Sequence, residues 1–152
     1  MKPHTLSALT LTLASALICA DAGAGTCTLS SVSGPYFGGY DTFNVSPLAT
    51  TGSVTFNCVS SGAISISLSR GGASSFFPRR MTSGSWSLLY NLFTDATHTA
   101  VWGDGTGGTS MYTNSSPPNG SNVTVTIYGR IPALQNVGVG SYTDTITATI
   151  NF

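Results

Sequence analysis

The residues best suited to chemistry lie between positions 95 and 108. Asp95 and His98 are three residues apart, and with one of the many serines they would supply the three side chains of a nucleophilic triad. No G-x-S-x-G sequence, which would present such a serine on a sharp turn, accompanies them. We therefore interpret His98 as a residue of a polar surface loop, and we predict no catalytic residues.

Asp104 and the glycines around it suggest two kinds of binding site, but the neighbouring residues support neither. A calcium loop needs several spaced oxygen ligands that end in a bidentate acid, and the sequence contains no Glu. A phosphate-binding loop ends in Gly-Lys-Ser/Thr before a helix, and the stretch 103–108 has no such ending. We interpret this stretch as a tight turn bonded to its own backbone, and we predict no metal and no cofactor.

The N-terminal residues predict export. A lysine precedes a largely apolar run, and the Ala-Asp-Ala sequence at 20–22 fits the small-residue pattern of a cleavage site, as does a site ending at Ala24. We predict a signal peptide over residues 1–22 and one domain over residues 23–152. No later segment is apolar enough to anchor the chain in a membrane.

Two cysteines, Cys27 and Cys58, follow the predicted cleavage site. An exported chain meets an oxidising compartment, so we predict a disulfide between them, with a pair of free buried thiols as the alternative. The bond would close a loop of about 32 residues, to which the chain-entropy model assigns roughly 3–4 kcal/mol.

Charged residues are scarce in the predicted domain. The four basic residues are Arg70, Arg79, Arg80 and Arg130, and the four acidic residues are Asp41, Asp95, Asp104 and Asp144. A net charge near zero creates no electrostatic attraction to nucleic acids or acidic membranes. We predict no nucleic-acid partner and no insertion into a membrane, and the scarcity of His, Glu and Lys argues against an exported enzyme.

Alternation of apolar and polar residues dominates the predicted domain. The apolar residues take every second position in the runs 54–58, 64–68, 86–92, 123–127 and 146–152. Turn sequences rich in Gly, Ser, Asn and Pro separate the runs, and no stretch has a convincing helical period. The pattern predicts an all-β, immunoglobulin-like β-sandwich, with a small closed barrel as the structural alternative.

The last predicted strand runs to Phe152, and no turn or returning strand follows it. A sandwich that ends in this way leaves a hydrophobic groove beside its C-terminal strand. The unpaired backbone groups of such an edge are a template for a strand from another chain. We therefore expect a protein that works by assembly rather than by catalysis.

A series of short motifs in the sequence resembles that of a known protein family. They are Phe37-Gly38-Gly39-Tyr40-Asp41, the stretch from Leu89 to Asp95, Trp102-Gly103-Asp104-Gly105, Tyr128-Gly129-Arg130-Ile131-Pro132 with Gln135, and the stretch from Gly140 to Ile146. In this order they cover nearly all of the predicted domain. The series resembles the spore coat protein U domain family, which includes the pilin subunits of archaic chaperone–usher pili.

The resemblance implies an incomplete immunoglobulin-like fold that lacks its final strand. The implied partners are a periplasmic chaperone, an outer-membrane usher, and a pilin subunit that supplies the donor strand. The implied location is the cell surface, reached through the periplasm, in a pilus or an extracellular coat with a role in adhesion and biofilm formation. The groove residues that we expect on this basis are Leu29, Val32, Ile146, Ala148, Ile150 and Phe152.

The sequence departs from the pilin pattern before its first cysteine. Only residues 23–26 separate the predicted cleavage site from Cys27, and four residues span at most about 14 Å. This segment has no alternating apolar residues with which to act as a donor strand. We expect a subunit that accepts a strand without giving one, at or near the tip of a pilus or as a non-polymerising unit of a coat.

The alternative function is a surface- or carbohydrate-binding adhesin module. The segment Phe76-Phe77-Pro78-Arg79-Arg80 favours it, because adjacent aromatic and cationic side chains at Phe76, Phe77, Arg79 and Arg80 would suit a contact surface. The competing interpretation buries both aromatic rings and leaves both arginines in solvent. An exposed apolar patch remote from the groove would favour the adhesin.

Overall fold

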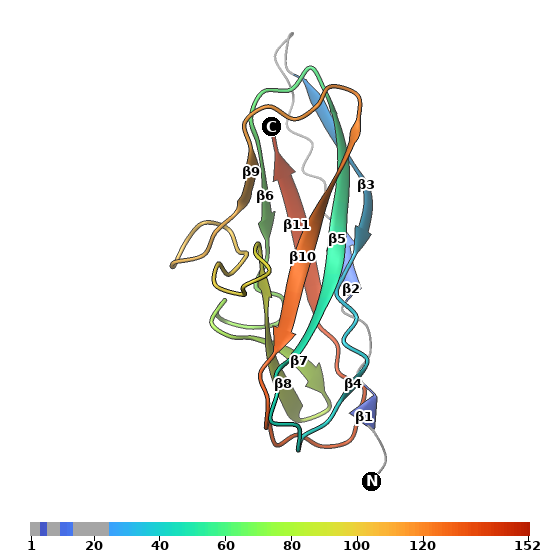
Figure 1. Ribbon diagram of the computed structural model, residues 1–152, viewed down its shortest axis with the longest axis vertical. Helices are drawn as coiled ribbons and strands as arrows, with labels where there is room; N and C mark the ends of the chain where they lie inside the picture. Colours follow the sequence, from blue (N-terminus) through green and yellow to red (C-terminus); the bar gives the residue numbers. More distant parts are fainter. Residues whose placement is uncertain (1–3, 6–9, 14–24) are drawn as a thin grey trace.

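Strands form all the regular structure in the part of the chain that the computed structural model describes, which is residues 4–5, 10–13 and 25–152. Figure 1 shows most of the long strands running along the long axis of the molecule. The eleven strands are β1 (His4–Thr5), β2 (Thr10–Leu13), β3 (Thr26–Ser33), β4 (Gly39–Tyr40), β5 (Leu48–Val59), β6 (Ile64–Leu68), β7 (Arg79–Ser83), β8 (Trp86–Phe93), β9 (Tyr112–Asn114), β10 (Asn122–Ile131) and β11 (Thr145–Asn151).

The larger sheet has five antiparallel strands in the order β3-β5-β10-β8-β7. Its centre is the long ladder between β5 and β10, which runs from Asn57 opposite Asn122 to Leu48 opposite Ile131. Apolar residues alternate along β5, so one face of the strand is buried at Val54 and Phe56.

The smaller sheet has four strands in the order β2-β11-β6-β9, and a two-stranded pair, β1-β4, lies apart from both sheets. Alternation again selects the buried face, because Ile64, Ile66 and Leu68 of β6 are almost inaccessible to solvent. The strand β11 contributes Ile146 and Ala148 to the same interior.

The core lies between these two sheets. Trp102 is fully buried there, and its Nε1–H donates to the carbonyl oxygen of Ile66 at 2.8 Å. Because two separate sheets face each other across a packed interior, the predicted β-sandwich is confirmed and the closed barrel is not what forms.

The strand β8 is covered on both faces near its end. Leu88 and Leu92 point into the main core, whereas Phe93 packs on the opposite face against Phe76 and Val101. This second cluster explains why apolar residues in the second half of the β8 run do not alternate strictly.

The predicted disulfide is confirmed. Cys27 of β3 lies directly opposite Cys58 of β5 in the antiparallel register, and their Cα atoms are 4.1 Å apart. The bond therefore joins an edge strand to its only neighbour in the larger sheet.

The predicted signal peptide falls largely outside the described residues, and so do the residues immediately before both predicted cleavage positions. Within it the structure describes only β1 and β2. Of the chain that is described, no helix is long and apolar enough to cross a membrane.

Candidate functional site

The edge of the smaller sheet beside β11 is the candidate site. On one side, β11 pairs antiparallel with β6, from Ala148 opposite Leu68 to Asn151 opposite Ser65. On its other side it pairs with β2, which runs parallel to it over residues 145–148. The strand β2 has no further neighbour in this sheet, so the backbone edge of β11 is occupied by a short segment from the N-terminal region.

The strand β3 forms the facing edge of the larger sheet. It pairs only with β5, and a register irregularity between Leu29 and Ser31 interrupts that ladder. Leu29 and Val32 are half-buried and pack against the main core. The segment β2 also contacts β3, so it lies between the edge strands of the two sheets (Figure 1).

The predicted groove residues accordingly come from two facing edges. Ile146 and Ala148 are fully buried, Ile150 is half-buried, and Phe152 is 58% exposed beyond the end of β11. The burial of these side chains decreases toward the C-terminus. Their role in receiving a strand stays a prediction.

A network of hydrogen bonds fixes the beginning of β11. The Tyr90 hydroxyl donates to Oδ2 of Asp144 at 2.7 Å, and the backbone amides of Gly72 and Thr145 donate to Oδ1. Gly71 has a φ of 66°, and a Cβ there would lie 2.2 Å from Asp144 Oδ2, so only glycine fits. Burial and the neighbouring Asp144 raise the pKa of Tyr90, which therefore stays a neutral donor.

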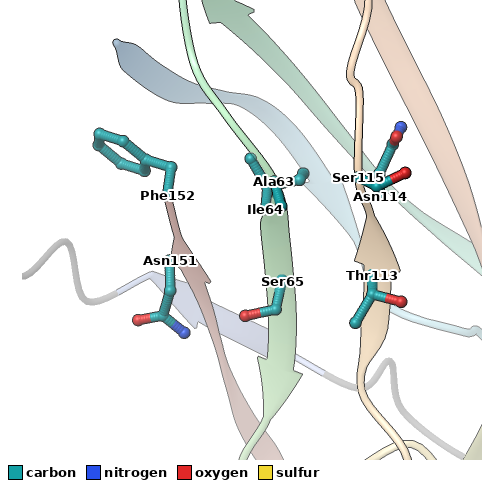
Figure 2. A pocket seen from close by; sticks show the side chains of 8 residues that line it. All are labelled: Ala63, Ile64, Ser65, Thr113, Asn114, Ser115, Asn151 and Phe152. Atoms are coloured by element: carbon teal, nitrogen blue, oxygen red, sulfur yellow. The ribbon is translucent and has the colours of Figure 1, made fainter. Parts of the chain in front are cut away.

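A hollow of about 580 Å³ lies at the far end of β11. Figure 2 shows Asn151, Ser65 and Thr113 from three neighbouring strands pointing the same way. These three residues are in register across the sheet. The lining contains no charged side chain, and of its residues sequence analysis had singled out only Phe152. The short strand β9, which completes this hollow, carried too few residues to give an alternating signal.

The segment 76–80, predicted as one contact surface, is divided by the fold. Phe77 is 51% exposed and Arg80 is exposed, but Phe76 and Arg79 are buried, so the expected surface is wrong for those two residues. The alternative interpretation also fails, because one ring is exposed and one guanidinium is buried. Arg79 lies opposite Tyr90 in the β7–β8 register and points inward with it.

The buried Arg79 guanidinium is held by uncharged acceptors. It donates to the carbonyl oxygen of Ser69 at 2.8 and 3.0 Å, to that of Trp102 at 2.6 Å, and to Oδ1 of Asn91 at 2.8 Å. It also lies 5.0 Å from the ring centroid of Phe76. Burial lowers the pKa of Arg79 to about 10. No sequence pattern distinguished this arginine from its exposed neighbour.

The described Asp95 and His98 are joined through their backbones, the amide of His98 donating to the carbonyl oxygen of Asp95 at 3.2 Å, and no hydrogen bond joins their side chains. The Asp95 carboxylate accepts hydrogen bonds from Thr97, Thr99 and Ala100. These bonds, first of all the one from the Thr97 hydroxyl, hold the pKa of Asp95 well below its usual range. The His98 ring instead packs edge-on against Phe93, with 5.2 Å between ring centroids. Asp95 therefore closes its own loop and does not orient the imidazole.

Asp104 likewise accepts from the backbone amide and hydroxyl of Thr106, as expected for a tight turn. Across the described residues, no three His, Cys, Asp or Glu side chains are grouped closely enough to hold a metal ion.

These features define an immunoglobulin-like sandwich of the pilin type, and the comparisons with known proteins assign its family. The model of the spore coat protein U domain matches residues 12–149, and the chain belongs to this family. This family includes structural subunits of chaperone–usher pili, which are exported to the cell surface. A curated relative, Protein U of Myxococcus xanthus, is 33% identical over 144 residues, which cover 84% of this chain and 78% of the relative.

A solved structure with the same fold is the CsuC–CsuE chaperone–tip adhesion subunit pre-assembly complex from archaic chaperone–usher Csu pili of Acinetobacter baumannii. The TM-score is 0.57 with 19% sequence identity. The match covers 84% of this chain but only 40% of the solved chain, so this chain spans less than half the length of that protein.

Proposed function

We propose that this chain is a pilus or coat subunit that accepts a donor strand from another subunit at the β11 edge. The observation that carries the proposal is the pairing of β11 with β2. Because β2 lies within the predicted signal peptide, its removal on export would leave the backbone groups on that side of β11 without partners. A strand from another chain would then take its place by β-strand addition.

The side chains at this edge favour a donor with alternating apolar residues. Ile146, Ala148 and Ile150 occupy every second position of β11 and face the core. Leu29 and Val32 pack against that core from the facing edge strand. A donor strand whose apolar residues recur with period two would fill the space between the sheets with one face and leave polar residues in solvent with the other.

The proposed partners are a periplasmic chaperone, an outer-membrane usher and a pilin subunit that provides the strand. Support comes from family membership and from the fold shared with a subunit that was solved with its chaperone. A place at or near the pilus tip belongs to the same proposal. It rests on the likeness to a tip subunit and on the short segment between the predicted cleavage site and Cys27.

A fused donor strand tests the acceptor edge directly. The chain comprising residues 25–152 would be extended after Phe152 by a flexible turn and a seven-residue strand of alternating apolar and polar residues. Burial of three or four apolar side chains, at about 1.5–3 kcal/mol each, should raise the melting temperature by about 10 °C or more. Thermal unfolding followed by circular dichroism measures the shift.

The matched control carries proline at the alternate polar positions of the same strand, because proline cannot donate to the backbone ladder. It should melt with the unextended chain. Equal melting temperatures for all three proteins would refute the proposed acceptor edge.

A second candidate function is adhesion to apolar surfaces, and exposed side chains at one end of the molecule favour it. Phe43 and Val45 are 70% and 78% exposed in the loop before β5, and Leu134 and Val139 are 61% and 78% exposed in the loop after β10. The pairing of Leu48 with Ile131 brings these two loops to the same end of the larger sheet. In Figure 1 this end lies opposite the C-terminus. Exposed apolar groups that gather in this way mark interaction surfaces.

Substitution at this end tests the adhesin. We expect the double variant Phe43→Ser and Val139→Ser to bind polystyrene beads several-fold less than the unsubstituted chain while keeping its melting temperature. Val59→Ser is the matched control, since Val59 is 47% exposed at the end of β5 remote from these loops. Equal losses in the control and the double variant would exclude a specific apolar end.

A further inference from the structure

A second hollow lies against the larger sheet, at the point where Arg130 of β10 is opposite Asn91 of β8. Its volume is about 280 Å³. Its apolar lining includes the rings of Phe77, Phe93 and Pro132. The candidate acceptor edge belongs to the other sheet, so the two sites are formed by different strands.

The walls of this hollow suit a flat apolar group. Phe93 is held in place by the cluster that it forms with Phe76 and Val101, whereas Phe77 is half exposed. The volume is near the lower limit of small-molecule pockets, which begin at about 300 Å³. Aromatic faces at offset or edge-on geometry would stabilise a bound ring beyond its simple burial. The hollow therefore fits a body of about one ring.

Arg130 is the free polar group of the lining. It is half-buried, and within residues 25–152 its guanidinium has no hydrogen bond or ion pair. The four carboxylates of that range are engaged elsewhere, by backbone amides or hydroxyl groups, at Asp41, Asp95, Asp104 and Asp144. The positive charge of Arg130 therefore faces the hollow without a protein counter-charge.

The other polar side chain at this point, Asn91, has three of its four hydrogen-bonding positions filled. Its Oδ1 accepts from Arg79 and from the backbone amide of Leu92, and its Nδ2 donates to the carbonyl oxygen of Phe76. Tyr90, which also contributes to the lining, directs its hydroxyl to Asp144. A ligand with several hydroxyl groups would find few partners here, so the lining favours a ligand with a single anionic group.

We propose that this hollow binds a small monocarboxylate with an aromatic or similarly flat apolar body, about the size of phenylacetate. The carboxylate would form a two-pronged pair with the Arg130 guanidinium, whose paired N–H groups match its geometry. One guanidinium balances one negative charge, which suits a carboxylate better than a doubly charged phosphate. The ring would lie between Phe77, Phe93 and Pro132.

Titration with three probes separates the charge from the ring. Phenylacetate carries both features, phenylacetamide keeps the ring without the charge, and acetate keeps the charge without the ring. We expect phenylacetate to shift the backbone and arginine Nε resonances of Arg130 and its neighbours in ¹H–¹⁵N spectra of residues 25–152. Its affinity should exceed that of either other probe by about tenfold.

Variants locate the site. Arg130→Gln should weaken phenylacetate binding about tenfold, and Phe77→Ser should weaken it several-fold at an exposed position whose change leaves folding intact. Arg80→Gln is the matched control, because Arg80 is an exposed arginine on the neighbouring strand β7 and does not line the hollow. Equal binding of phenylacetamide, or an equal loss in Arg80→Gln, would overturn the proposal. So would the absence of any shift in the unsubstituted protein.

Discussion

Arg79 is unusual because its fully buried positive charge is matched by carbonyl and amide oxygens instead of a carboxylate. Its donors connect the segment after β6, the segment before β9 and the strand β8 through Ser69, Trp102 and Asn91. The carbonyl oxygens of Ser69 and Trp102 would otherwise lie unpaired in the interior, where each unsatisfied group costs about 1–3 kcal/mol. The side chain thus holds the two sheets in one arrangement.

We predict that Arg79→Met lowers the free energy of unfolding by about 3 kcal/mol, because it leaves these acceptors without donors. Urea denaturation measures the change. Arg80→Met on the solvent side should change the free energy by less than about 0.5 kcal/mol. If the two variants were equally stable, the buried hydrogen bonds would not contribute as inferred.

The lowered pKa of Asp95 predicts that the free energy of unfolding falls at acid pH. Its pKa is lowered in the folded chain, chiefly by the Thr97 hydroxyl, so below about pH 4 the unfolded chain binds a proton that the folded chain does not. The contribution of the Asp95 carboxylate to the free energy of unfolding is complete above that pH and is lost as the pH falls further. Asp95→Asn should therefore show a shallower fall in unfolding free energy between about pH 4 and pH 2.

Thr97→Val tests the cause of this effect, because it removes one donor from the Asp95 carboxylate. The slope of its unfolding free energy against pH should lie between those of the unsubstituted chain and Asp95→Asn. Parallel slopes for all three chains would mean that Asp95 has the same pKa in the folded and unfolded states.

At the scale of elements, β3 and β11, the two strands that would border the proposed groove, differ in how they are held. The strand β3 has one neighbour and a disulfide, whereas β11 has β6 on one side and the short β2 on the other. The disulfide compensates for the ladder that β3 lacks on its outer side. It keeps this strand in place as one wall of the proposed groove.

Removing the disulfide should therefore affect β3 most. We predict that Cys27→Ala combined with Cys58→Ala lowers the free energy of unfolding by about 2–4 kcal/mol. Amide exchange in β3 should accelerate more than exchange in β10, which has strand neighbours on both sides. Uniform acceleration across both strands would show that the bond stabilises the whole fold without specifically holding the edge.

At the scale of the whole molecule, the two sheets bury a continuous core but have one edge whose partner comes from the N-terminal region. The ladder between β2 and β11 covers four residue pairs. We predict that the full chain melts several degrees above residues 25–152, because each net backbone hydrogen bond contributes about 0.5–1.5 kcal/mol. Differential scanning calorimetry compares the two proteins.

Thr12→Pro in the full chain should bring the melting temperature close to that of residues 25–152, since proline removes a backbone donor from β2. Thr12→Ala keeps that donor and serves as the control. A full chain that melts together with residues 25–152 would deny β2 any stabilising role at this edge.

Much of this architecture could be predicted from the order of residues. Period-two alternation determined the main strands and their buried faces, because successive side chains of a strand point to opposite sides. The predicted export and the two cysteines Cys27 and Cys58 led to the disulfide, and the apolar run ending at Phe152 led to a C-terminal strand, which the structure has as β11. That β11 offers an edge to another chain stays a prediction. These signals are local or depend on composition, so no tertiary information was needed to read them.

Only the tertiary structure decided which members of similar pairs are buried. Phe76 and Arg79 lie inside and Phe77 and Arg80 outside because the fold brings acceptors from Ser69 and Trp102, distant in sequence, to one arginine alone. The free guanidinium of Arg130 and the apolar hollow beside it likewise depend on which strands become neighbours. The burial of a side chain and its hydrogen-bond partners depend on contacts between segments that are distant in sequence. A local sequence pattern therefore does not predict them.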